Sequence, residues 1–348
     1  MEFKAFEKFV AAARKLCSLN YVIAADGEKV YTIVSDSDYT AVLGMYAAEQ
    51  QPFIISVETA VSLVNAGKAI KAKTISLADG IAYIDTLKVP YEQKDVAWQE
   101  SEVTIAYGDK LDIDSKVVKR MLNILCKDDV RFQLTNIFVD RNSNIFVTDG
   151  FALAVNFPGG SLQIADTMSI IPGFVKFLDV EKATFFALPD NHGCFATDNQ
   201  HFILYRLSSE TESADFAVNF INTVIRRILE PTLYDTENGH NVIINKNLIS
   251  FLYESNTSYQ REVDVTKNLV KIVRRNKKNR LEDDLLLLEQ EIKSDADFLV
   301  NGNFLYQIIK VFDTDSVTIF QGKKSHLLVK PNNNTNFMAV LMPMERPQ

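Results

Sequence analysis

The residues best suited to acid–base or metal chemistry in this chain are a few aspartates. Asp149 lies in Thr148-Asp149-Gly150 after a strand-like run, and Asp36 and Asp38 form a closely spaced pair. Such carboxylates can act as general acids or bases, or bind a metal ion. Thr-Asp-Gly after a strand is also the pattern of a tight turn, in which aspartate accepts backbone hydrogen bonds and glycine adopts a positive φ. We therefore favour a turn at Asp149 over a catalytic site.

The other residues that enzymes use do not show catalytic or ligand spacing. The histidines and cysteines are scattered, without HxH, HxxxH or CxxC: His192, His201, His240, His326, Cys17, Cys126 and Cys194. The chain has no GxSxG, GxxxxGKS or GxGxxG motif. Isolated cysteines indicate reduced thiols in a cytosolic protein. The sequence thus predicts no catalytic residue, no metal site and no cofactor.

Composition describes a folded protein with more than one domain. The chain has 348 residues, of which 47% are hydrophobic and 24% charged, and one core rarely grows to this size. Uncharged runs fall short of the roughly 20 residues that a membrane span needs. Segment 1–9 contains acidic residues, unlike a secretory signal. We therefore expect a cytoplasmic protein with no membrane contact.

Basic residues are concentrated on single faces of two predicted helices, although the net charge is −8. Net charge does not show how charges are distributed. The faces on helices 3–18 and 115–126 consist of Lys4, Lys8, Arg14, Lys15, Lys116, Lys119, Arg120 and Lys127. They suit contacts with phosphates that do not read sequence, but a solvated helix face has the same pattern. The run 274–280 could likewise touch nucleic acid or form a solvated hairpin loop.

The chain repeats one pattern three times: helix, strands, helix, strands. First helices are predicted to begin near residues 3, 115 and 245, and second helices near 56, 171 and 303. Similar tripeptides recur at strand ends: Val34-Ser35-Asp36, Val147-Thr148-Asp149 and Ala196-Thr197-Asp198. Such repetition indicates one module used several times. The sequence predicts an α+β fold of three similar domains, 1–108, 109–212 and 213–348, each with two helices backed by antiparallel sheets.

Local signals suggest where some elements begin and end. The predicted helix N-caps are Ser56, Ser115 and Asn245. Gly67 is expected to end the helix that starts at Ser56, and Pro172 to open a helix over 171–178. Residues 129–140 have the composition of a strand.

A family resemblance is carried by the order and spacing of several short segments. They are Asp129–Leu134, Val147–Gly150, Leu153–Val155, Ile170–Pro172, Arg226–Leu229 and Ala339–Met344. In this order they resemble the bacterial-type DNA polymerase sliding clamp, as a divergent member from a phage or mobile element. After Thr-Asp-Gly this chain has Phe151-Ala152, where the family usually has a basic or histidine pair.

The resemblance implies a processivity factor without catalytic activity. Such clamps are homodimeric rings of three DNA-clamp domains per subunit, whose inner helices encircle double-stranded DNA. The basic helix residues above would then face DNA. A pocket would bind short linear peptides of the polymerase and the clamp loader. The matching pocket residues are Leu134, Thr148, Gly150, Leu153, Val340, Met342, Pro343 and Met344.

Two other functions stay open from the sequence. One is a metal-dependent nuclease or hydrolase on an α+β scaffold, with Asp149 as its first candidate residue. The other is a clamp-derived scaffold used in transcription regulation, which would not be retained on circular DNA as a ring is.

Overall fold

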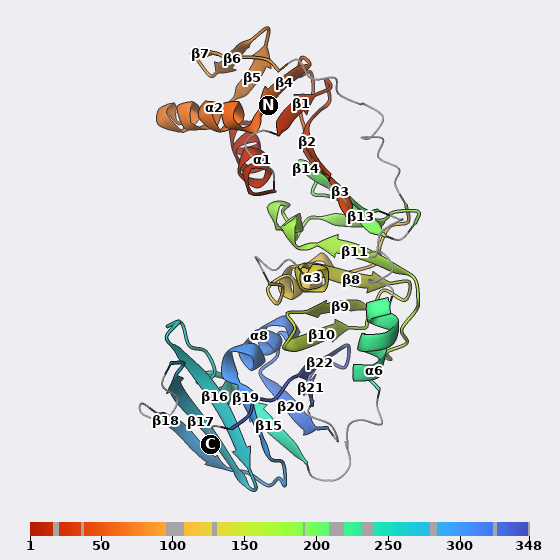
Figure 1. Ribbon diagram of the computed structural model, residues 1–348, viewed down its shortest axis with the longest axis vertical. Coiled ribbons are helices and arrows are strands. Elements are labelled where there is room, and N and C mark those ends of the chain that lie inside the picture. Colours follow the sequence, from red (N-terminus) through yellow and green to blue (C-terminus); the bar gives the residue numbers. More distant parts are fainter. Residues whose placement is uncertain are drawn as a thin grey trace. The chain divides into compact units, whose positions relative to one another are not determined.

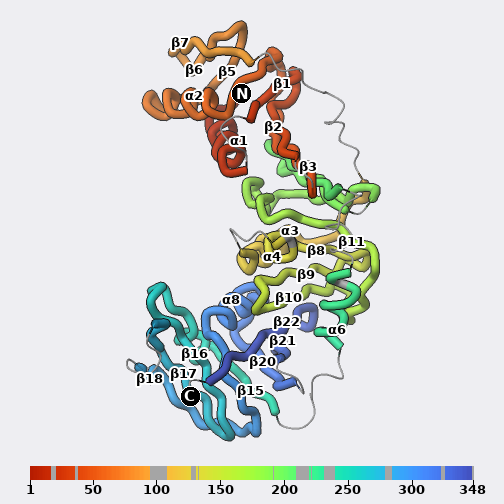
Figure 2. The backbone as a smooth tube through the Cα atoms, viewed as in Figure 1, coloured from red at the N-terminus to blue at the C-terminus, as the bar shows by residue number. Residues whose placement is uncertain are grey.

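The structure, a computed structural model (Figures 1 and 2), describes most of the chain. The described residues are 1–16, 21–35, 38–94, 108–126, 131–190, 192–208, 219–230, 240–278, 284–322 and 326–346. They belong to two compact units. Unit 1 comprises Met1–Lys116 and Ser169–Phe216, and unit 2 comprises Val117–Met168 and Ala217–Gln348. This division into two units does not test the predicted boundaries of the three domains, which stay a prediction.

Unit 1 contains two long helices, α1 (Phe3–Leu16) and α2 (Val57–Ile70), and two antiparallel sheets. The larger sheet has the order β12 (Thr184–Ala187), β13 (Gly193–Thr197), β14 (His201–Leu207), β3 (Tyr39–Tyr46), β2 (Lys29–Ser35), β1 (Val22–Ala25) and β4 (Phe53–Ser56). The smaller has β5 (Ile75–Ala78), β6 (Ile81–Ile84) and β7 (Leu87–Pro90). Because β14 pairs with β3, the first and second repeats share one sheet.

Helix α1 forms where the sequence predicts it, because apolar residues recur every three or four positions. Phe6 and Phe9 are fully buried, and Lys4 and Lys8 on the other face are exposed. The predicted cap Ser56 is confirmed, since its side chain accepts a hydrogen bond from Thr59 N at the start of α2.

Gly67 does not end α2, contrary to the prediction. The helix continues to Ile70 and ends at Lys71, whose φ of 55° is left-handed and whose N–H bonds back to Gly67 O. A Cβ at Gly67 would lie 2.0 Å from Cε2 of buried Phe3. The glycine therefore allows α1 and α2 to pack closely, a requirement that the local sequence does not reveal.

Unit 2 contains a large antiparallel sheet built from the second and third repeats. Its strands follow in the order β8 (Asn136–Asp140), β9 (Ile145–Thr148), β10 (Ala152–Asn156), β22 (Phe337–Leu341), β21 (Leu327–Pro331), β20 (Ser316–Gln321) and β15 (Asn241–Asn245). A second sheet has the order β18 (Leu285–Glu291), β17 (Leu269–Asn276), β16 (Tyr259–Thr266) and β19 (Phe298–Asn301). The predicted α+β fold is thus confirmed.

The helical elements of unit 2 are mostly short. They are α4 (Phe132–Thr135), the π-helix η3 (Phe220–Ile225), α6 (Arg226–Ile228), α7 (Lys246–Ile249), α8 (Gly302–Phe312) and most of α3 (Ser115–Met121), whose first two residues belong to unit 1. The predicted cap Asn245 is confirmed, because its Oδ1 accepts from Asn247 N and Leu248 N. In Figure 1, α8 lies to the left of β9 and β10, and α6 lies to their right.

Four predicted boundaries in the second repeat are wrong. The helix predicted over 115–126 ends at Met121. The Asp114 carboxylate, not Ser115, accepts from Lys116 N, at 2.8 Å, and Ser115 Oγ instead donates to Glu181 O. Residues 132–135 are helical rather than part of the predicted strand. Pro172 ends β11 (Met168–Pro172), and the element that follows is a 3₁₀-helix, η2 (Gly173–Phe177). The residues at these boundaries have no strong preference for helix or strand, so tertiary packing determines which of the two they form.

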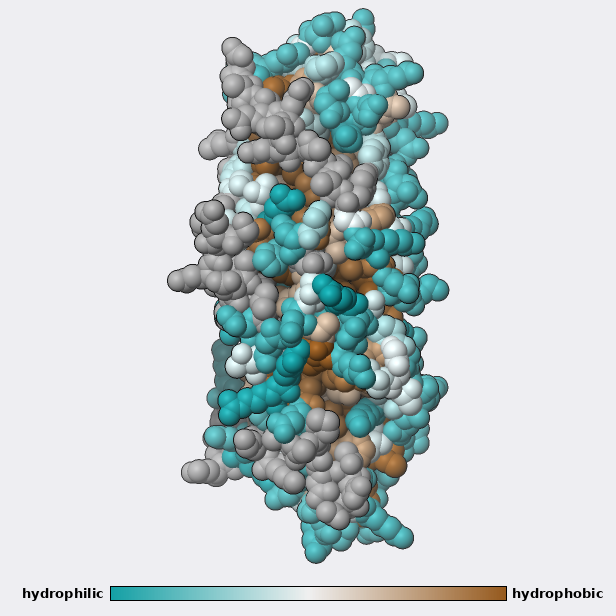
Figure 3. Space-filling view, turned by 90° about the vertical axis from the view of Figure 1, so that its right-hand side faces the viewer, coloured by the Kyte–Doolittle hydropathy of each residue, from teal (hydrophilic) through white to brown (hydrophobic). Residues whose placement is uncertain are grey.

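The face drawn in Figure 3 is mainly hydrophilic, with smaller apolar areas between the hydrophilic side chains. Few large apolar side chains are exposed among the described residues. Those that bear on function are Phe151, Tyr253, Leu285, Leu286 and Met342. Large apolar side chains in contact with water often mark interaction sites when they are clustered.

Candidate functional site

The turn between β9 and β10 has the structure predicted for Thr148-Asp149-Gly150. Asp149 Oδ1 accepts from Phe151 N at 2.9 Å and from Ala152 N at 2.8 Å. Thr148 Oγ1 accepts from Gly150 N at 3.0 Å and donates to Ala152 O at 2.7 Å. Gly150 has a φ of 90°, which favours glycine. The carboxylate of Asp149 therefore shapes a turn.

Burial raises the pKa of Asp149 above its ordinary value, although the N–H groups of Phe151 and Ala152 oppose the shift. Within the described ranges, no three His, Cys, Asp or Glu side chains are placed to hold a metal ion. Asp36 lies outside the described residues. The position of Asp149 thus gives the nuclease hypothesis no support.

Five of the predicted pocket residues meet at this turn. Leu153 on β10 lies opposite Thr148 on β9 and opposite Val340 on β22. Leu134 on α4 is buried, and its Cδ1 lies 3.6 Å from the position of a Cβ at Gly150. Residues up to 206 positions apart in sequence, from 134 to 340, are therefore brought to one place.

The three C-terminal pocket residues continue from the end of β22. Met342 N donates to Phe151 O at 2.9 Å, and Met344 N donates to Leu299 O on β19 at 2.7 Å. Met342 is 47% exposed, whereas Pro343 and Met344 are half-buried. A flexible, polarisable methionine at such a surface suits contacts with varied apolar partners.

Two residues of this site were not in the predicted set. Phe151 is 56% exposed and stacks on Phe304 of α8, with ring centroids 5.2 Å apart and planes 12° apart. Phe151 could have been identified from the sequence, because it departs from the family pattern after Thr-Asp-Gly. Phe304 on α8 is half-buried. Together with Met342 they give the site an apolar and aromatic edge.

The predicted DNA-facing residues differ in their surroundings. Lys4, Lys8, Arg14 and Lys15 are all exposed on α1, as are Lys116 and Lys119 on α3. Arg120 is half-buried; its Nη1 lies 2.9 Å from Asp313 Oδ2, and its guanidinium lies over the Phe337 ring. Arg120 therefore joins α3 to the end of α8. Lys127 lies outside the described residues.

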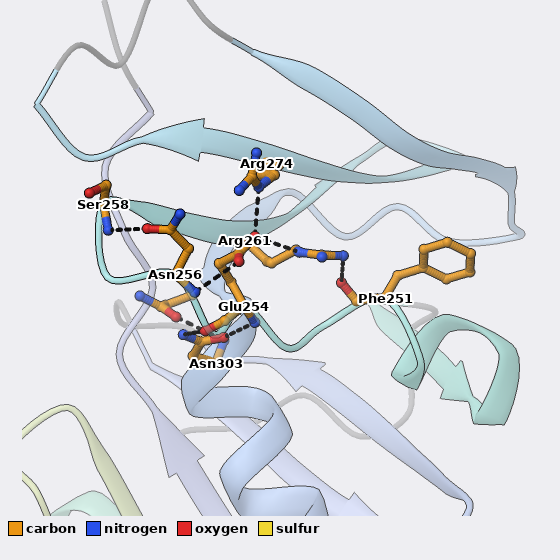
Figure 4. A network of polar contacts seen from close by, with 8 residues as sticks. Phe251, Glu254, Asn256, Ser258, Arg261, Arg274 and Asn303 are labelled. Atoms are coloured by element: carbon orange, nitrogen blue, oxygen red, sulfur yellow. Dashed lines mark hydrogen bonds and ion pairs between the residues drawn. The ribbon is translucent and has the colours of Figure 1, made fainter.

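The basic run 274–280 begins with two arginines that have structural partners. Arg274 Nε lies 2.6 Å from Glu254 Oε2, as Figure 4 shows, and Arg275 Nε lies 2.6 Å from Glu262 Oε2. Burial opposes ionisation of Glu254, but Asn256 N and the two arginines 274 and 261 outweigh it and lower its pKa. Arg275 therefore links β17 to β16, and Arg274 links β17 to the segment before β16. Residues 279–280 lie outside the described part.

Comparison with solved structures shows similarity over the whole chain. The DNA polymerase III subunit beta from Pseudomonas aeruginosa has a TM-score of 0.65 at 16% identity, with 99% of each chain covered. The DNA polymerase sliding clamp from Caulobacter crescentus has 0.66 at 12%, again with 99% of each covered. The DNA polymerase III beta subunit from Thermotoga maritima has 0.63 at 13%, covering 100% of this chain and 99% of the other.

Sequence comparison gives no further relative, since neither a protein-family model nor a curated protein matches the chain. In the described part, no helix is both long and apolar enough to cross a membrane. The similarity in structure extends from end to end, so it includes both sheets that join successive repeats. The chain therefore has the fold of a sliding-clamp subunit.

Proposed function

We propose that this chain is a DNA sliding clamp, a processivity factor that encircles double-stranded DNA and tethers a polymerase. The observation that carries the proposal is the structural match to polymerase III beta subunits over 99% of this chain. A closed ring stays on DNA by topology rather than by affinity, so the net charge of −8 is no obstacle. The identities of 12–16% are in keeping with the predicted phage or mobile-element origin, and we expect the protein to act in the cytoplasm.

The exposed cations of α1 and α3 are the proposed DNA contacts. Lysine and arginine side chains on exposed helix faces can approach phosphates through water and can exchange from one phosphate to the next. Lys4, Lys8, Arg14 and Lys15 are exposed on α1, as is Lys116 on α3, and these side chains are the first candidates for such contacts. Arg120 would contribute less, because Asp313 already neutralises its charge.

The site at the β9–β10 turn is the proposed attachment point for the polymerase and the clamp loader. Its buried residues Leu134, Leu153 and Val340 form an apolar floor, and Met342 and Phe151 are exposed beside them. Short peptides commonly bind through one or two apolar anchors placed in such a site. The Phe151–Phe304 stack favours a partner peptide whose residue at this edge is apolar rather than acidic.

Self-association into a ring needs two complementary edges on each subunit. In the described structure β18 is an outer strand of its sheet, with Leu285 55% exposed and Leu286 52% exposed. In unit 1, β7 is an outer strand with Leu87 partly exposed. Edge strands with apolar side chains readily pair with another chain. A head-to-tail contact between β18 and β7 of two copies would close a homodimeric ring.

Topological trapping tests the function without a clamp loader. A linear duplex is fixed to a bead at one end, the protein threads on from the free end, and that end is then blocked by a bulky protein. A high-salt wash removes proteins held by charge. We expect the chain to remain on blocked DNA and to leave when a nuclease cuts the duplex. Equal loss from blocked and open DNA would contradict the proposal.

A further inference from the structure

Two tyrosines of the third repeat form an aromatic pair at the surface of unit 2. Tyr253 follows α7 and is 54% exposed, and Tyr306 lies on α8. Their ring centroids are 5.2 Å apart, with planes 36° apart. Tyr253 is too exposed to be a core residue. A large aromatic ring held at the surface against a second ring offers a flat face to a ligand.

A lysine extends this pair along α8. Lys310 is exposed, and its Nζ lies 5.3 Å from the centroid of the Tyr306 ring. The three side chains therefore form a row of exposed ring, second ring and cation. Acidic residues near this end of α8 have basic partners: Asp313 pairs with Arg120, and Asp315 with Lys246. Because these two carboxylates are paired with cations, they repel an anion that approaches Lys310 less than unpaired carboxylates would.

The segment that carries Tyr253 is firmly held. Glu254 N donates to Asn303 Oδ1 at 2.8 Å, and Asn303 Nδ2 donates to Glu254 O at 3.3 Å. The Glu254 carboxylate pairs with Arg261 and Arg274, and Arg261 Nη1 donates to Phe251 O (Figure 4). Tyr253 thus lies between two anchored residues. A preorganised ring loses little conformational entropy when a ligand stacks on it.

We propose that Tyr253, Tyr306 and Lys310 form a stacking contact for the unpaired bases of single-stranded DNA. A base would stack on the exposed face of Tyr253, and Lys310 would contact a neighbouring phosphate. Bases inside a duplex are already stacked, so this contact selects single strands. This proposal rests on the proposed function only in that the chain works on DNA. It adds a binding site for single-stranded DNA to the proposed contacts with the duplex.

The test measures the affinity of the full-length chain for a fluorescent oligothymidine by anisotropy. Stacking on one aromatic side chain contributes about 1–3 kcal/mol per base, so Tyr253→Ala should weaken binding roughly 5- to 150-fold. Tyr253→Phe should retain most of the affinity, because it keeps the ring. Lys310→Gln should weaken binding and reduce its salt dependence by about one phosphate contact.

Tyr83→Ala is the matched control. Tyr83 on β6 is another exposed tyrosine, but Lys88 Nζ lies over its ring at 5.5 Å, in contrast to Tyr253. Circular dichroism would establish that each variant is folded. Unchanged oligothymidine affinity in Tyr253→Ala, or the same loss in Tyr83→Ala, would overturn the proposal and leave the pair as a surface for docking a protein.

Topological trapping separates this inference from the proposed function. Tyr253→Ala should remain trapped on blocked duplex DNA as the unmodified chain does. If the chain is trapped but Tyr253→Ala binds oligothymidine normally, the stacking site is wrong and the clamp stands. If the chain is never trapped but Tyr253→Ala loses oligothymidine affinity, the stacking site stands without the clamp.

Discussion

At the scale of residues, Asp149, the first candidate for catalysis, belongs to a turn that occurs twice among the described residues. In both copies the threonine, Thr148 or Thr197, donates to the carbonyl four residues later. In both, the aspartate that follows, Asp149 or Asp198, accepts from the backbone N–H groups two and three residues later. The recurring tripeptides in the sequence therefore mark a repeated structure. The threonine and aspartate side chains of these tripeptides form hydrogen bonds within the chain.

The two aspartates differ in their electrostatic surroundings, which predicts opposite pH dependence. Burial opposes the charge of Asp198, but His201 and the N–H groups of Asp179, His201 and Gln200 outweigh it and hold its pKa below the ordinary value. Its charged form therefore stabilises the fold above the ordinary pKa of about 3.9, and this contribution is lost as the pH falls. Asp198→Asn should lower the free energy of unfolding by about 1.5–3 kcal/mol at neutral pH, and by less in acid.

Asp149→Asn is the control for this experiment. Because burial raises the pKa of Asp149, the charged form costs stability as the pH rises through that raised pKa. The effect of Asp149→Asn relative to the unmodified chain should therefore become less unfavourable toward neutral pH. Urea unfolding followed from roughly pH 3 to pH 7 measures both variants. The same slope with pH in both would contradict this electrostatic account.

At the scale of elements, the packing of α1 on α2 depends on the missing side chain of Gly67. Gly67→Ala would place a methyl group 2.0 Å from Cε2 of Phe3, which is only 3% exposed. Overpacking of this kind costs about 1–3 kcal/mol, and thermal unfolding would detect it as a lower Tm.

Two further variants make the Gly67 experiment specific. Gly159→Ala should be nearly neutral, because no atom lies within 4 Å of a Cβ at that glycine. Phe3→Leu combined with Gly67→Ala should recover part of the loss, because the smaller side chain makes room. A destabilisation of equal size in Gly159→Ala, or no coupling with Phe3→Leu, would show that steric contact is not the cause.

Helices with regular apolar spacing could be predicted from the sequence, and long-range pairing could not. The spacing of Phe3, Phe6 and Phe9 predicts α1 correctly. By contrast, Leu153 meets Val340 only because β10 and β22 pair, and no local pattern contains that information. The family resemblance, rather than a local pattern, predicted that Leu153 and Val340 belong to one pocket. Tyr253 and Tyr306 were missed for the same reason, since their contact joins two separate elements.

At the scale of the whole molecule, the proposed ring depends on the outer edge of β18. Leu286→Asp should lower the solution mass toward that of one chain, because a buried, unpaired carboxylate opposes edge pairing. Ile243→Asp is the matched control, since Ile243 on β15 is 56% exposed but lies on the other sheet of unit 2. Analytical ultracentrifugation compares the two. An unchanged mass in Leu286→Asp, or an equal effect of Ile243→Asp, would exclude β18 as the interface.

The solution mass of the unmodified chain, combined with a low-resolution image of the particles, tests the central claim most directly. A clamp should have a mass near twice the 39.3 kDa of one chain, and its particles should show a central hole wide enough for duplex DNA. Particles of one chain, or assemblies without a hole, would contradict the account.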